Sequence, residues 1–393
     1  MVNIRRQLMG LGFITASSIM AMSAAHALNG QSNIKVDGGP LGQLEMSGGF
    51  DAFAYTMTNN GAGEHQSGSR VDALYLELQK TTGVVQFTVE MGNDNGGGIV
   101  LGQAPSTIQS MNMRSAGPVK LAFITIAPSN LPVTISAGVL GGLEGYESST
   151  AWQNVSLFTS DLCATTTSNQ LGVNGNFSKG PVSITLQFGD VADTKVFNFL
   201  SGLGSYTFNS NNVLNVYFGT ALGRVGQYAH TNIGGTNNGT WSSSAVGLGN
   251  PFVNGSVVGA YYSWTHGNLN LVPEVQYAYA KVDHQAGFDK STSNFGAAVF
   301  GDYSFANTPY SIGGWVAYEK SIGSQTSWYI GPNDESIALA VSPTWQYKYL
   351  YVRGNLGIVH LLHNTANGTS YGFGSSGSAK TQFVGALETG FVF

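Results

Sequence analysis

The sequence has few charged residues and no run of apolar residues long enough for a transmembrane helix. Only 9% of its 393 residues are charged, whereas soluble domains average about 25%. After residue 27, no stretch reaches the ~18 consecutive apolar residues that a spanning helix needs. Cys163 is the only cysteine, so no intrachain disulfide can form. The net charge is −5 and there is no basic cluster, so the sequence does not indicate nucleic acid as a partner.

The N-terminus has the order of a secretory signal peptide. Arginines at positions 5 and 6 precede an uncharged, mostly apolar run over residues 8–23, and the small-x-small site Ala25-His26-Ala27 follows. A membrane-spanning helix is the alternative, but the run is short for a span and ends in a cleavage site. We therefore expect export, cleavage after Ala27, and one domain formed by residues 28–393.

Apolar and polar residues alternate along most of the remaining chain. Ile184 and Leu186 alternate with Thr185 and Gln187, for example, which is typical of a strand with one apolar and one polar face. We expect about sixteen such strands, with fourteen or eighteen as alternatives because residues 191–212 are the least regular. The predicted strands span 43–57, 70–81, 84–93, 119–127, 131–140, 168–178, 181–190, 203–209, 212–223, 254–266, 269–282, 293–305, 308–321, 334–347, 348–360 and 380–393.

The connections between these segments alternate between short and long. The short ones, such as Lys179-Gly180 and Gly267-Asn268, consist of tight-turn residues. The long ones are 58–69, 94–118, 141–167, 191–202, 224–253, 283–292, 322–333 and 361–379. This alternation is typical of an up-and-down outer-membrane β-barrel, in which an even strand number places both termini in the periplasm.

Closure of the sheet follows from backbone hydrogen bonding. Hydrocarbon offers no partner to a free N–H or C=O, so a sheet can cross lipid only without an edge. Sixteen strands leave a lumen wide enough for water, which favours a pore. A secreted sandwich, propeller or solenoid is the alternative, but those folds lack the long-and-short loop alternation. Pro273 and Pro343 lie inside predicted strands, where we expect bulges.

The last predicted strand places Phe383, Leu387, Phe391 and Phe393 on one face. This pattern resembles the closing strand of Gram-negative outer-membrane barrels, where it is read by the barrel-assembly machinery. The resemblance implies that Phe391 and Phe393 form an assembly signal and that outer-membrane lipid surrounds the barrel. It also implies a homotrimer as one possible assembly. The simpler alternative is that Phe393 anchors the strand in an aromatic girdle.

A second resemblance lies in the glycine-rich run Gly138–Glu147, followed by Asn154 and Leu157-Phe158. It is similar to a segment of the β-barrel porin-2 family, in which a strand runs into a glycine-rich loop that bears glutamates. The Ser-Arg-Ser stretch of that loop is absent here. The resemblance implies a bacterial outer-membrane porin.

The loop 141–167 contains the constriction candidates Glu144, Glu147 and Asp161. If the loop folds inward, its acids favour cations in a low-dielectric constriction; the alternative is a solvated external loop. The polar strand faces add pore-lining candidates, of which only one is basic: Glu45, Asp51, Glu77, Glu90, Glu274, Glu319, Arg353 and Glu388. Acidic residues outnumber basic ones on this face, so we predict a weak preference for cations.

Enzymatic motifs are absent from the sequence. It contains no Gly-x-Ser-x-Gly, no His-Glu-x-x-His and no phosphate-binding Gly-Lys-Ser/Thr. His360 and His363 fall on opposite faces of a strand, so we expect neither a metal nor another cofactor. Tyr217 or Trp315 could stack on sugars, although packing is the simpler role. The sequence favours passive diffusion of ions or small polar solutes. The alternatives are a surface barrel whose loops bind partners and, more remotely, a hydrolase.

Overall fold

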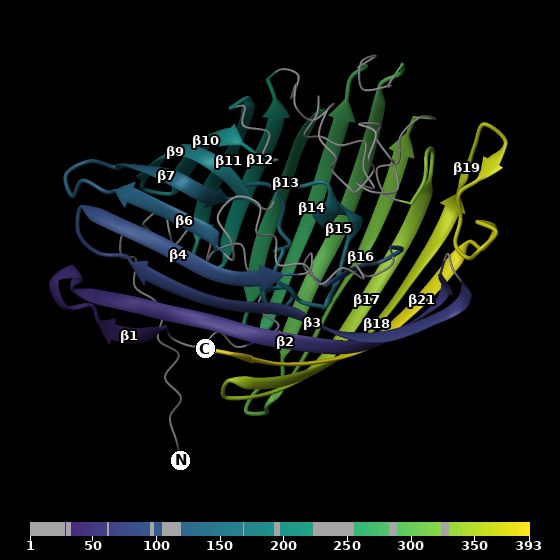
Figure 1. Ribbon diagram of the computed structural model, residues 1–393, viewed down its shortest axis with the longest axis horizontal. Helices are drawn as coiled ribbons and strands as arrows, with labels where there is room; N and C mark the ends of the chain where they lie inside the picture. Colours follow the sequence, from purple (N-terminus) through teal and green to yellow (C-terminus); the bar gives the residue numbers. More distant parts are fainter. Residues whose placement is uncertain are drawn as a thin grey trace.

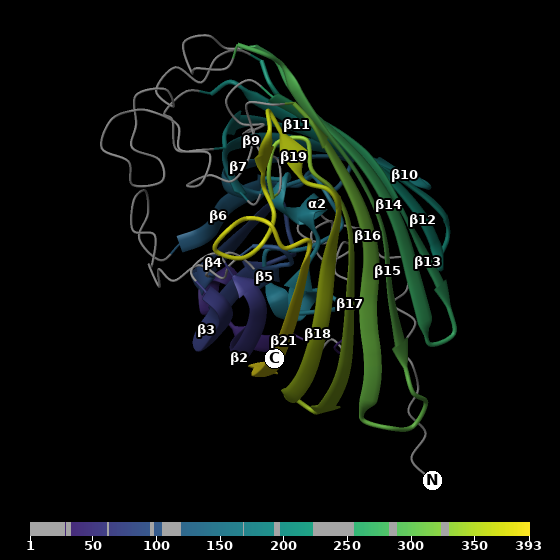
Figure 2. The ribbon, with the colours of Figure 1, turned by 90° about the vertical axis from the view of Figure 1, so that its right-hand side faces the viewer.

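Sixteen antiparallel strands form one closed ring in the computed structural model (Figure 1, Figure 2). The structure describes residues 28, 33–60, 63–94, 98–103, 119–167, 169–191, 197–222, 255–282, 289–323 and 330–393. Neighbours in the ring are neighbours in sequence, and the last strand pairs with the first from Gly49↔Val392 to Met57↔Val384. This last pairing leaves no open edge, as a sheet in hydrocarbon requires.

The ring is made of strands 8 to 18 residues long. Its members are β2 (Gln43–Asn60), β3 (Gly63–Lys80), β4 (Val85–Asp94), β6 (Val119–Ile126), β7 (Val133–Gly141), β9 (Asn169–Lys179), β10 (Val182–Asp190), β11 (Phe199–Asn209), β12 (Asn212–Ala221), β13 (Gly255–His266), β14 (Leu269–Ala280), β15 (Thr292–Ser304), β16 (Tyr310–Ile322), β17 (Glu335–Tyr347), β18 (Leu350–His363) and β21 (Thr381–Val392).

The remaining elements are short. β1 (Ile34–Asp37) pairs with β2, β5 (Ile99–Val100) pairs in parallel with β8 (Phe158–Thr159), and β19 (Thr365–Ala366) pairs with β20 (Thr369–Ser370). The helical turns are η1 (Gly39–Leu41), η2 (Ala151–Gln153) and α2 (Asp161–Ala164). Among the described residues, no helix has the length and apolar character needed to cross a bilayer.

The prediction of a sixteen-strand barrel is confirmed, but two predicted loops are shorter than expected. β2 and β3 remain paired as far as Asn60↔Gly63, so most of 58–69 is an extended hairpin. β11 begins at Phe199, inside the predicted loop 191–202. Continued backbone pairing extends both hairpins beyond the alternating stretch that the sequence marks. The predicted signal peptide, residues 1–27, lies outside the described residues.

The bulges predicted at Pro273 and Pro343 are absent. Pro273 keeps register with Val299, and the pairing of β13 with β14 has the same register on both sides of it. The same holds for Pro343 between β16 and β18. Both prolines are exposed on the outer face of the barrel. A proline suits an extended strand when the neighbouring strand omits one hydrogen-bonded pair, so no extra residue is needed.

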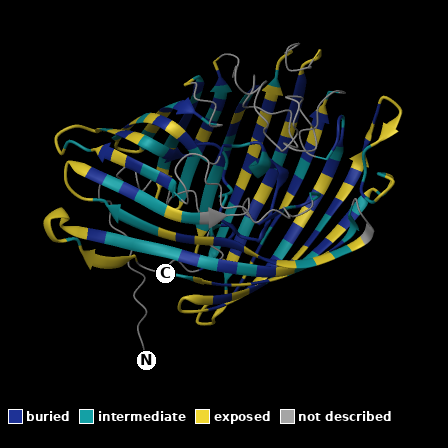
Figure 3. Ribbon diagram, viewed as in Figure 1, coloured by how far each residue is buried: buried dark blue, intermediate teal, exposed yellow. Residues whose placement is uncertain are grey.

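Buried and exposed residues alternate along the strands (Figure 3), and most of the exposed positions are apolar. On β10, Ile184 and Leu186 are 45% and 51% exposed, whereas Thr185 and Gln187 are 4% and 1% exposed. The polar residues therefore face inward and the apolar ones face the membrane, as the alternation predicts.

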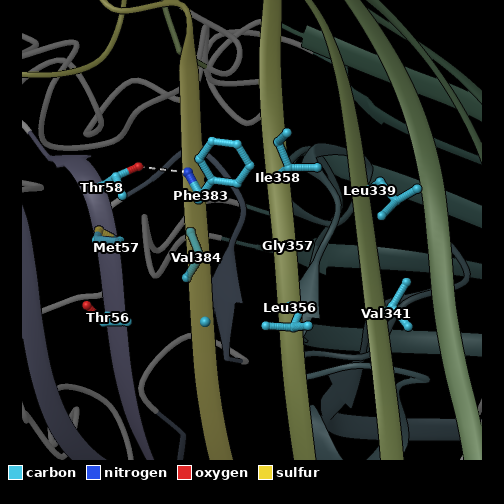
Figure 4. Close-up of a pocket in the computed structure, with 11 residues that line it drawn as sticks. Thr56, Met57, Thr58, Leu339, Val341, Leu356, Gly357, Ile358, Phe383 and Val384 are labelled. Atoms are coloured by element: carbon cyan, nitrogen blue, oxygen red, sulfur yellow. Dashed lines mark hydrogen bonds between the residues drawn. The ribbon is translucent and has the colours of Figure 1, made fainter.

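An apolar hollow of about 560 Å³ lies on the outer wall, over the seam where the barrel closes (Figure 4). Leu339, Leu356, Ile358 and Phe383 from β17, β18 and β21 line it. These side chains belong to the membrane-facing set, so the hollow opens to the outside of the barrel and is separate from the lumen.

Candidate pore constriction

The loop between β7 and β9, residues 141–167, folds into the barrel; we call it the inward loop. Ser156, Leu157 and Phe158 have no exposed surface, and α2 lies between the barrel walls (Figure 2). The alternative of a solvated external loop is therefore wrong. Ile99 and Val100, from the preceding long loop, pair in parallel with the inward loop at Phe158 and Thr159.

The inward loop brings an apolar core into a lumen that the sequence predicts to be polar. Leu157, Phe158 and Leu162 pack with wall residues into one buried cluster. The wall contributes large side chains such as Phe300 and Trp315, which are 1% and 4% exposed. Burial of side chains of this size stabilises the fold by about 1.5–3 kcal/mol each. The lumen is thus filled on this side by a packed core.

Polar contacts fix the inward loop to β16, β17 and β18. The Trp315 indole donates to the Phe158 carbonyl at 2.7 Å. The Asn355 side-chain oxygen accepts from the Leu157 backbone N–H at 3.0 Å. Ser342 donates to Ser156 at 2.7 Å. These three contacts give loop groups that lose water in the lumen a hydrogen-bond partner from the wall.

Arg353 is the strongest of these anchors. Its guanidinium forms two hydrogen bonds with Glu388, at 2.7 and 2.9 Å, and donates to the carbonyls of Ala151 and Asn154 at 3.0 and 2.8 Å. Arg353 and Glu388 are opposite each other in the β18–β21 register, and neither side chain has any exposed area. These two predicted pore-lining residues therefore lie beneath the loop, neutralising each other. Asp51 is equally buried and accepts from the Ala73 N–H at 2.8 Å.

Glycines on the inner wall make room for the loop. A Cβ on Gly313 would lie 2.2 Å from the Val155 carbonyl oxygen, and one on Gly296 would lie 2.7 Å from Leu162. A Cβ on Gly219 would lie 2.5 Å from the Glu144 carboxyl, and one on Gly357 would lie 2.8 Å from the Phe158 ring. Glycine is the residue that permits such close approach. Part of the glycine content therefore shapes the wall to fit the inward loop.

Two of the three predicted loop acids, Glu144 and Glu147, accept hydrogen bonds from hydroxyls of the same loop, and the third, Asp161, lies close to other acids. Glu144 accepts from the Thr167 hydroxyl, and burial raises the pKa of Glu144 to about 7. Glu147 accepts from the Ser160 hydroxyl and N–H, and burial raises its pKa to about 8. Burial likewise raises the pKa of Asp161 to about 7. Carboxyls held this way carry less negative charge at neutral pH than solvated ones.

The other predicted lining acids divide into two groups. Glu274 and Glu319 are 2% and 1% exposed, and Glu274 accepts from the Tyr217 hydroxyl at 2.7 Å. Glu45, Glu77 and Glu90 remain half-buried on the opposite part of the wall. These three, on β2, β3 and β4, are the predicted acids that keep access to water.

Glu77 and Glu90 lie directly opposite each other in the β3–β4 register. Like charges at such a position are destabilising. The ammonium of Lys120 is 3.6 Å from Glu90, and it also donates to the Tyr75 and Thr150 hydroxyls at 2.8 and 3.1 Å. Lys120 therefore links the acidic wall to the inward loop.

Comparison with known proteins identifies the family. The family model described as "Putative beta-barrel porin-2, OmpL-like" matches residues 42–393. The chain belongs to this porin family. It is therefore an outer-membrane porin, as the sequence resemblance implies. No curated protein sequence matches the chain.

Solved porin structures share the fold of this porin at low sequence identity. The anion-selective porin from Comamonas acidovorans has a TM-score of 0.57 and 10% identity, covering 89% of this chain and 99% of its own. The trimer form of OmpT from Vibrio cholerae gives 0.56 and 9%, covering 89% and 99%. OmpF from Salmonella typhi, in complex with daunomycin, gives 0.53 and 13%, covering 92% and 100%. Identities this low show the fold alone.

Sequence reasoning missed two basic residues inside the porin. Arg70 pairs with Asp72 at 2.9 Å, and Lys120 pairs with Glu90. Lys120 occupies a position that strict alternation assigns to the outer face of β6, but a register shift at Glu90 and Met91 places it inside. A bulge of this kind leaves no clear mark in the sequence.

The structure also describes the residues of the porin that were predicted for assembly and for stacking on sugars. Phe391 is 40% exposed on the outer face, and its ring centroid is 5.3 Å from that of Phe393. The backbone of Phe393 exchanges two hydrogen bonds with Gly48, which secures the end of the closing strand. Tyr217 and Trp315 are buried under the inward loop and bonded to Glu274 and Phe158, which agrees with a packing role.

Proposed function

We propose that this porin passes small hydrophilic solutes and ions by passive diffusion through the part of the lumen that the inward loop leaves open. The observation that supports this most is the uneven lining of the barrel. The inward loop packs against β14–β18, whereas inward-facing polar side chains on β2, β3, β9 and β11 keep partial exposure. They include Ser47, Gln79, Asn174, Ser178 and Ser205. Hydroxyls and amides of this kind can replace water around a neutral solute.

The alternative is a surface barrel whose long loops bind a partner while the lumen stays closed. The packed core beneath the inward loop favours this alternative, because it fills lumen space that a wide pore would need. Homotrimerisation of the porin is a further proposal, supported by the trimer form of the Vibrio cholerae structure with the same fold.

Planar-bilayer recording separates the two functions. The purified porin is expected to insert as discrete, stable conductance steps in KCl, and liposomes that contain it are expected to swell in small sugars. The loop core narrows the path, so swelling should fall off with solute size. Insertion without conductance steps or swelling would support the partner-binding barrel and would contradict a pore.

The charges that reach water on the wall support a weak cation preference. Glu45, Glu77 and Glu90 outnumber Lys120 there, whereas the Arg353–Glu388 pair is buried and neutral overall. Exposed wall charges set the field that a passing ion meets. The fold itself does not decide the sign, since an anion-selective porin shares it.

Reversal potentials in a KCl gradient test this preference. The natural porin should favour K⁺, the Glu77→Gln/Glu90→Gln double variant should favour it less, and Lys120→Gln should favour it more. Glu335→Gln is the matched control, because Glu335 pairs with the half-exposed Lys320 away from these wall charges. Anion selectivity of the natural porin would contradict the assignment.

A further inference from the structure

Three carboxyl groups from different elements meet where α2 contacts the wall. Asp161 begins α2, Glu319 lies on β16, and Asp334 immediately precedes β17. They are 3%, 1% and 1% exposed. Asp161 and Glu319 lie side by side, and the charge of Asp334 acts on both. The loop thus meets this part of the wall through groups of like charge.

The hydrogen bonding of this acid cluster is incomplete. Within the described part of the chain, neither carboxyl oxygen of Glu319 has a hydrogen-bond partner, although Asn294 is close by. One oxygen of Asp161 and one of Asp334 also lack partners. An ionised carboxylate can only accept hydrogen bonds. Two carboxyl groups can therefore share a buried site only when one of them holds a proton and donates it to the other. A proton held by one of these carboxyl groups would supply the missing donor.

The surroundings add negative charge to this site. The groups that act most on Asp161 and its neighbours are acidic: Glu319, Asp334, Glu274 on β14 and Glu147 in the loop. Lys320, next to Glu319 along β16, pairs with Glu335 at 3.3 Å and is half exposed. Loss of the proton would therefore place several repelling carboxylates between the loop and the wall.

We propose that a proton shared between Asp161 and Glu319 latches the inward loop to the wall, so that the loop loosens as pH rises. The effect on conduction rests on the proposed pore, whereas the latch itself does not.

The direction of this pH dependence follows from the linkage between proton binding and docking of the loop. Burial raises the pKa of Asp161 to about 7 in the docked loop, whereas in a released, solvated loop the carboxyl regains its ordinary value. The docked state therefore binds more protons. Docking is strongest below about pH 4 and weakens as pH rises towards about 7, with Glu147 extending the range to about 8.

Cys163 supplies a reporter within α2, two residues from Asp161 and half-buried. The full-length porin in liposomes is treated with a small uncharged maleimide, and the labelling rate is compared between the natural chain and Glu319→Gln at the same pH. This ratio cancels the pH dependence of the thiol. The amide introduced by Glu319→Gln can donate to Asp161 without a proton, so the latch of that variant should persist at high pH. Between about pH 5.5 and 8, we expect the ratio of natural to variant rate to rise by about tenfold.

A constant ratio over that range would overturn the latch. Glu335→Gln, next to the cluster and half-buried, should label like the natural chain. If Glu319→Gln does not assemble, Asp161→Asn provides the same comparison. Conductance is then recorded over the same range. If the labelling ratio rises but no conductance is seen at any pH, the proposed pore is contradicted and the latch is supported. If conductance changes equally with pH in the natural porin and in the variant, the latch is contradicted.

Discussion

Replacing Arg353 by methionine is expected to lower the free energy of unfolding by about 3–5 kcal/mol. The substitution leaves Glu388 buried without its partner, and the carbonyls of Ala151 and Asn154 lose their donor. Urea unfolding of the purified barrel in detergent, followed by tryptophan fluorescence, measures the loss. The inward loop should also loosen, because it is held to β18 through these contacts.

Two further variants separate burial from charge. In Arg353→Met/Glu388→Leu both charges are gone, so most of the stability should return even though the loop carbonyls stay unpaired. Lys320→Met breaks a half-exposed pair at 3.3 Å and should change stability by only about 0–1 kcal/mol. If the three variants unfold at the same urea concentration, Arg353 has no anchoring role.

The strands could be predicted because their determinants are local. Each residue faces either lipid or the lumen, so alternation such as Ile184-Thr185-Leu186 reports its environment directly. The ends of the strands are predicted less accurately, as at Asn60, where backbone pairing continues beyond the alternating stretch of sequence. The sequence predicts a bulge at Pro273 that the structure lacks, because register depends on the neighbouring strand, which the proline itself does not encode.

The position of the inward loop could not be predicted, because its determinants are distant in the sequence. Val155 fits against Gly313, and Ala151 and Asn154 meet Arg353, about two hundred residues later. A glycine in a strand signals close approach but does not say of what. The sequence predicts the loop acids as constriction residues, but burial changes what they can do. Burial raises the pKa values of all three, so their charge at neutral pH depends on protonation inside the barrel.

The fit between loop and wall gives the last prediction. In Gly313→Ala, the new methyl group would lie 2.2 Å from the Val155 carbonyl oxygen, and a backbone atom cannot swing aside as a side chain can. The loop must then move away from β16, which strains the neighbouring bonds from Ser342 to Ser156 and from Trp315 to Phe158. Overpacking of this kind costs about 1–3 kcal/mol.

The displaced segment can move only towards the open part of the lumen, so Gly313→Ala should lower single-channel conductance and destabilise the barrel together. Gly175→Ala is the matched control, because a Cβ there meets nothing within 4 Å and faces outward from β9. It should leave conductance unchanged and stability within about 0.5 kcal/mol. Normal conductance and stability in Gly313→Ala would mean that the inward loop does not press on this wall, and the glycines would then need another explanation.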